Sequence, residues 1–142
     1  MEVLTIKTIE SGATMRTRLS KSIVLALRTL MGQGEPTELS LDLVAFIVLA
    51  LEKIAESVNQ SAQAWEKRDY WLKADQFRME WAWAERICEV LCPAVLARDW
   101  TKIIPELTKL AQPLGKIKVS ASHRLGEPWI GAWQTLVQNQ KS

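Results

Sequence analysis

The feature that most constrains the fold is a stretch of 56 residues, from Thr37 to Cys92, that contains neither glycine nor proline. These two residue types are the ones that most often interrupt helices and form turns. A stretch of this length without them is typical of helix. It also contains four of the seven tryptophans, which are Trp65, Trp71, Trp81 and Trp83. We therefore expect large aromatic rings at helical positions in a core or an interface.

The length and composition of the chain indicate a single globular unit. The 142 residues are 48% hydrophobic and 24% charged, which is ordinary for a globular protein. A chain of this length buries about two-thirds of its unfolded surface, so its fold needs no disulfide or metal. We predict one helical domain over residues 1–142, in the form of an all-α bundle of four to five helices.

Two rows of residues in the glycine-free stretch repeat every seven positions, as expected for one face of a helix. The first row is Val44, Leu51, Val58, Trp65, Leu72 and Met79, and the second is Val48, Ala55, Ala62, Asp69, Gln76, Trp83 and Val90. One helix over residues 41–92 would be about 78 Å long at 1.5 Å per residue. A compact domain of this size has a radius of gyration of only about 14–15 Å.

That mismatch predicts a turn near residues 67–69 of the stretch. Lys67 and Arg68 suit the C-terminus of a helix, and Asp69 suits the cap of the next one. The alternative is one continuous helix that a second chain covers.

Helix boundary signals divide the rest of the chain. They predict a first helix over residues 14–31, an N-cap at Ser40 for the second helix, and a break in the third at Pro93. A fourth helix follows Thr101, and a last helix opens at Pro128.

Two short segments have strand-like patterns. Residues 3–9 are rich in β-branched side chains, and residues 117–121 alternate apolar with polar side chains. We predict that they pair as a minor two-stranded β ribbon beside the bundle.

Charge is distributed unevenly along the chain, although the net charge is only +2. Residues 1–34 and 101–142 have net charges of +3 and +4, whereas residues 35–64 have −4. Basic termini suit a nucleic-acid-binding protein, in which cations neutralise phosphates. The candidate contacts are Arg16, Arg18, Lys21, Lys116 and Lys118. This alternative requires the first helix and residues 116–118 to lie side by side.

Two pairs of carboxylates suggest a third class of function. Glu52 and Glu56 are one helical turn apart, as are Glu85 and Glu89. In an antiparallel hairpin the pairs lie level, and carboxylates are ligands that Mg²⁺ prefers. This arrangement, which suits a small divalent-metal-dependent hydrolase, resembles the all-helical nucleotide pyrophosphatases in outline. The tighter glutamate and aspartate spacing of that family is absent, so no residue role carries over.

The cysteines and the single histidine predict no cofactor. Cys88 and Cys92 are four residues apart on a helix, which disfavours a disulfide, and we expect both to be buried as small apolar groups. His123 lies far from them, so no zinc ligand set forms. Without a signal-peptide pattern or an apolar run near 20 residues, we expect a cytoplasmic protein with no membrane span.

The remaining function class is a non-enzymatic interaction module, working as an adaptor or assembly factor. Its partner would be a protein, either another protein or a second copy in a homodimer, because tryptophan is enriched at binding hot spots. The interface candidates are Trp81, Trp83, Trp129 and Trp133. Since positions two apart on a helix point about 200° apart, we expect Trp81 and Trp83 to meet different surfaces.

Overall fold

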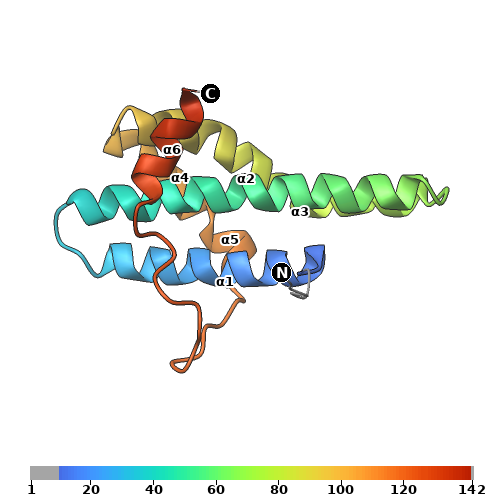
Figure 1. Ribbon diagram of the computed structural model, residues 1–142, viewed down its shortest axis with the longest axis horizontal. Coiled ribbons are helices and arrows are strands. Elements are labelled where there is room, and N and C mark those ends of the chain that lie inside the picture. Colours follow the sequence, from blue (N-terminus) through green and yellow to red (C-terminus); the bar gives the residue numbers. More distant parts are fainter. Residues whose placement is uncertain (1–9, 142) are drawn as a thin grey trace, which may run out of the picture.

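The protein is an all-α bundle in the computed structural model, which describes residues 10–141 (Figure 1). Its helices are α1 (Gly12–Met31), α2 (Glu38–Glu66), α3 (Trp71–Leu96), α4 (Trp100–Lys109), α5 (Ala111–Leu114) and α6 (Ala132–Gln140). Figure 1 shows α1 running alongside α2, and α6 crossing the first half of α2. The predicted all-α bundle of four to five helices is confirmed, with α5 as an additional single turn.

The centre of the fold is an antiparallel hairpin of α2 and α3, which pack on each other along their length. Helix α2 has 29 residues and is about 44 Å long at 1.5 Å per residue. Its first half is buried almost all round, with Leu43, Ile47 and Leu51 fully inaccessible to solvent. From α3, Leu91 and Val95 pack into the same hydrophobic cluster. The apolar first half of α2 is therefore the core around which α1, α3 and α6 assemble.

The hairpin turn forms without glycine. The N–H of Tyr70 donates to the carbonyl of Trp65 at 2.9 Å, and the N–H of Asp69 donates to that of Glu66 at 3.0 Å. Asp69 has a φ of 64°, the left-handed conformation that ends many helices and that aspartate tolerates better than most residues. The predicted turn is confirmed and the continuous helix is wrong. Asp69 ends α2, however, and does not cap α3, which has no side-chain cap at Tyr70.

Several helix boundaries differ from those predicted. The N-cap of α2 is Thr37 and not Ser40, because the two residues form a reciprocal capping box one turn earlier. Helix α3 continues through Pro93 to Leu96, and Pro93 is exposed there. The last helix begins at Ala132, after a turn over residues 128–131.

The predicted β ribbon does not form in the part of the chain that the structure describes. Residues 117–121 contain no strand, and residues 3–9 lie outside the described residues. Ile117 and Val119 pack against the hydrophobic core, while Lys118 and Ser120 are exposed. The alternation therefore reflects an irregular segment lying on the helices and not a paired strand.

A buried arginine joins α1 to both arms of the hairpin. Arg16 is 7% exposed, and its Nη1 donates to Ser57 Oγ at 2.6 Å and to Ser61 Oγ at 3.2 Å on α2. Its guanidinium also lies over the rings of Phe77 and Trp81 on α3, at 4.8 and 5.9 Å from their centroids. Burial lowers the pKa of this guanidinium, which nevertheless stays charged at neutral pH.

The start of α1 approaches α2 so closely that a side chain at its first residue, Gly12, would be crowded. A Cβ at Gly12 would lie 3.1 Å from Arg16 Nη1 and 3.2 Å from Ser57 Oγ. A larger side chain would therefore require the guanidinium or the Ser57 hydroxyl to shift by a few tenths of an ångström. Gly12 and Arg16 therefore act together to seat α1 on the hairpin.

Helix α6 is held by a side chain from α2. The carboxylate of Asp42 accepts hydrogen bonds from the backbone N–H groups of Gly131 and Trp133, at 3.2 and 2.9 Å. A carboxylate at a helix N-terminus satisfies free N–H groups and interacts favourably with the helix dipole. Gly131 has a φ of 79°, a conformation that glycine adopts without strain.

Arg16→Ala should destabilise the fold by about 2 kcal/mol, because it leaves a cavity between α1, α2 and α3 and removes buried hydrogen bonds. Chemical denaturation of the variant and the parent chain measures the difference. Arg18→Ala is the matched control, since Arg18 pairs with Glu10 on the surface of the same helix. Equal effects of the two substitutions would contradict a structural role for Arg16.

Candidate functional site

The end of the α2–α3 hairpin projects beyond the start of α1, as Figure 1 shows. It is braced internally by three contacts. Trp65 packs edge-to-face on Phe77 with ring centroids 4.8 Å apart, and Lys73 Nζ lies 4.6 Å from the centroid of the Trp65 ring. Arg78 forms an ion pair with Glu66. The projecting end is thus an ordered two-helix element.

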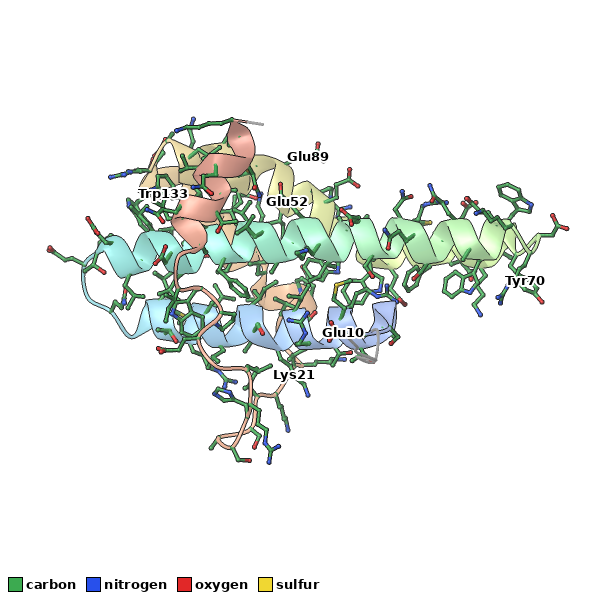
Figure 2. All side chains as sticks on the ribbon, in the orientation of Figure 1. Glu10, Lys21, Glu52, Tyr70, Glu89 and Trp133 are labelled. Carbon is green, nitrogen blue, oxygen red and sulfur yellow. The ribbon has the colours of Figure 1, made fainter. Side chains whose placement is uncertain are left out.

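Large apolar side chains are exposed on this projecting end. Tyr70 is 56% exposed, Trp71 58%, Leu72 71% and Met79 77%. Figure 2 labels Tyr70 at the outermost turn of the hairpin. We call Tyr70, Trp71 and Leu72 the hairpin tip. These residues were not predicted as an interface from the sequence. Leu72 and Met79 belong to the first seven-residue row, which is the sequence signal that could have identified them.

The four tryptophans predicted for an interface occupy different environments. Trp129 is only 3% exposed and belongs to the hydrophobic core, so it is not available to a partner in this fold. Trp133, labelled in Figure 2, is half-buried beneath the guanidinium of Arg98, which lies 5.1 Å from its ring centroid. Trp81 and Trp83 are also half-buried.

Trp81 and Trp83 meet different surfaces, as expected, since Trp81 lies beside the Arg16 guanidinium and Trp83 lines a cavity with Pro113. Their rings also contact each other, which was not predicted. Their ring centroids are 5.7 Å apart and the planes are inclined by 30°, so the two indoles stack on each other. The prediction considered only the directions of the Cβ atoms. An indole extends far enough beyond its Cβ for the two rings to meet at the side of the helix.

The two carboxylate pairs line one cavity between α2 and α3, as the antiparallel alignment predicted. The cavity has a volume of about 720 Å³ and includes Glu52, Glu56, Glu85 and Glu89. Figure 2 labels Glu52 and Glu89 on the same side of the hairpin. Within residues 10–141, however, no three His, Cys, Asp or Glu side chains lie close enough to hold a metal ion. The four glutamates of the hydrolase alternative thus share a cavity, but among the described residues they do not form a set of metal ligands.

Burial alters the acid–base properties of groups around this cavity. Partial burial raises the pKa of the Glu52 carboxyl. Burial, reinforced by the negative charge of Glu52, raises the pKa of the Cys88 thiol to about 12. Its Sγ is 3.7 Å from the Val48 carbonyl, to which it donates a weak hydrogen bond. Cys88 is buried as predicted, whereas Cys92 is only half-buried, and both are free thiols.

The basic candidates are divided between the interior and the surface. Arg16 is buried, so it does not reach a phosphate outside the fold. Arg18 is paired with Glu10 at 2.8 Å, while Lys21, Lys116 and Lys118 are exposed.

The segment after α5 nevertheless lies near α1. Ser20 and Ile117 line one cavity of about 290 Å³, and they are sequence neighbours of Lys21 and of Lys116 and Lys118. The fold therefore brings the chain segments that carry three of the five basic candidates close together.

Comparison of the chain with protein-family models, with curated proteins and with solved structures finds no match. Among the helices of residues 10–141, none combines the length and the apolar character that a bilayer crossing requires.

Glu52→Gln should raise the melting temperature at pH 7 by about 1–2 °C. Because the pKa of Glu52 is raised in the folded state, that state holds the proton more tightly than the unfolded chain does. The resulting stability is present at low pH and is lost as the pH rises through the folded-state pKa. The gain from the uncharged amide should therefore disappear below about pH 4, the range of an ordinary glutamate.

Thermal melts of both chains from pH 3.5 to 8 measure this difference. Glu127→Gln, in the exposed loop before α6, is the control. A gain that does not depend on pH would contradict the assigned cause.

Proposed function

We propose that this protein is a non-enzymatic helical interaction module, an adaptor or assembly factor that presents the end of the α2–α3 hairpin to a protein partner. The observation that carries the proposal is the exposure of the hairpin tip together with Met79 on a projecting, ordered element. Exposed apolar side chains grouped in this way are typical of interaction sites. Tryptophan and tyrosine are also the residues most enriched at binding hot spots.

The arrangement of the hairpin favours binding further, because its conformation does not depend on a partner. Arg16 anchors the base of the projecting part, and the Glu66–Arg78 pair braces its middle. A binding element that is already ordered loses little conformational entropy on association. Trp81 and Trp83 lie at the base of this element and are the predicted interface residues that fit the proposal.

Replacing Trp71 and Leu72 together by alanine should abolish or strongly reduce binding to a protein partner, without loss of the fold. Both side chains are more than half exposed, so little packing is lost. Affinity capture with the parent chain and the variant, followed by quantitative mass spectrometry, compares the bound proteins, and light scattering reports self-association.

The matched control is Met31→Ala combined with Ile130→Ala, which removes two equally exposed apolar side chains far from the hairpin tip. Partner binding that survives the hairpin variant would contradict the proposal. A lone monomer that captures nothing would also contradict it.

A second candidate function, nucleic-acid binding, is favoured by one observation: Ser20 and Ile117, the sequence neighbours of Lys21 and of Lys116 and Lys118, line the same cavity. Net positive charge in residues 101–142 adds to the attraction for phosphates. Only three of the five predicted cations contribute, since Arg16 is buried and Arg18 is paired.

If this candidate is right, the chain should shift a labelled oligonucleotide at low salt, and the affinity should fall steeply as salt rises. Lys21→Glu combined with Lys118→Glu should remove the shift. Lys53→Glu, on the exposed surface of α2, is the control for net charge. Absence of any shift at low salt would remove the nucleic-acid function.

A further inference from the structure

Helix α3 carries a stripe of exposed side chains and one half-buried side chain, Trp83, on the side facing away from α2. It consists of Leu72, Gln76, Met79, Trp83 and Val90, which we call the α3 stripe. These positions fall within about 40° of one direction around the helix at 100° per residue. Leu72, Met79 and Val90 are 71%, 77% and 48% exposed, whereas Ala74, Ala84 and Cys88 on the opposite side are buried against α2.

The spacing of the stripe is that of a coiled-coil seam. Its members are alternately four and three residues apart from Leu72 to Trp83, and Trp83 and Val90 are one heptad apart. They are also the continuation, beyond the turn, of both seven-residue rows of the sequence. Before the turn, Val44, Leu51 and Val58 are buried. After the turn, the residues that continue this row, Leu72 and Met79, are exposed.

We infer that the α3 stripe is a self-association surface, on which α3 of a second copy of this chain packs antiparallel. This inference rests on the proposed interaction function and names its partner. In an antiparallel coiled coil, residues of one seam position face the other seam position of the partner helix. Leu72 then lies opposite the partner's Trp83, and Gln76 lies opposite the partner's Met79. Two-fold symmetry repeats each of these contacts, so each occurs twice in the dimer.

Charges beside the stripe select this orientation. Lys73 and Glu80 are exposed and lie one heptad apart on the same side of the stripe. Antiparallel pairing places Lys73 next to the partner's Glu80, and the two-fold axis repeats the attraction. Parallel pairing would place Glu80 next to the partner's Asp75, a like-charge contact that is also repeated. Such flanking charges determine the orientation of coiled coils.

The same pairing places the hairpin tip of each chain in a groove of the other. A cavity of about 730 Å³ lies between α3 and the α4–α5 region, with Trp83, Val90 and Pro113 among its lining residues. Leu72 and Trp83 are 11 residues apart, about 17 Å along the helix. When Leu72 of one chain meets the partner's Trp83, the hairpin tip that carries Leu72 comes to the mouth of this groove.

Light scattering of the full chain after size-exclusion chromatography, at several concentrations, should give twice the single-chain mass of 16.1 kDa. Met79→Glu should reduce the mass to that of one chain, because it places carboxylates at the centre of the seam. Met79 is mostly exposed, so circular dichroism should show an unchanged helix content. Met31→Glu, at an equally exposed apolar residue outside the stripe, should leave the dimer intact.

A charge exchange tests the orientation. Lys73→Glu alone and Glu80→Lys alone should each weaken the dimer about tenfold or more, since each replaces two attractions with two repulsions. The combined variant should restore the parent affinity, because the antiparallel pairs are re-formed with reversed sign. Failure of the combined variant to restore the dimer would overturn the antiparallel arrangement.

The two proposals fail in distinguishable ways. A parent chain that is monomeric at all concentrations, yet captures another protein through Trp71 and Leu72, overturns self-association and leaves the interaction function standing. A dimer that Met79→Glu does not affect overturns the α3 stripe as its interface. A monomer that captures nothing overturns both.

Discussion

The buried guanidinium of Arg16 is the interaction on which the shape of this molecule depends. It contacts Ser57 and Ser61 on one arm of the hairpin and the rings of Phe77 and Trp81 on the other. A buried cation requires hydrogen-bond acceptors and polarisable neighbours, and this position supplies both. It also marks where α1 begins. On one side of it the hairpin is covered by α1, and on the other side it projects beyond that helix.

The fold class could be predicted from the sequence because it depends on the absence of glycine and proline over residues 37–92. A stretch without glycine or proline, combined with a length limit for a compact domain, required two helices and a turn. The details of helix ends could not be predicted in the same way. Asp69 and Arg98 both adopt a positive φ where α2 and α3 end, a conformation in which glycine is the usual signal. Thr37 and Ser40 each qualify as a cap, and only the three-dimensional capping box decides between them.

The candidate site was harder to predict, since exposure is a tertiary property. The seven-residue rows identified Leu72 and Met79 as members of one helical face, but they gave no indication that this part of the face is exposed. Tryptophan content directed attention to Trp129, which the structure buries, and away from Trp71, which it exposes. Periodicity indicates that a face is apolar. It does not indicate whether the same chain covers that face.

An uncovered apolar face has a cost that the rest of the molecule has to offset. Complete burial of a leucine or methionine side chain contributes about 1.5–3 kcal/mol, and Leu72 and Met79 contribute little of this within one chain. The hairpin remains ordered because the Trp65–Phe77 contact and the Glu66–Arg78 pair brace it from within. The free energy that these side chains do not contribute to folding is therefore available for association. A rigid helix pair whose outer face has the seam spacing of a coiled coil is best suited to another helix.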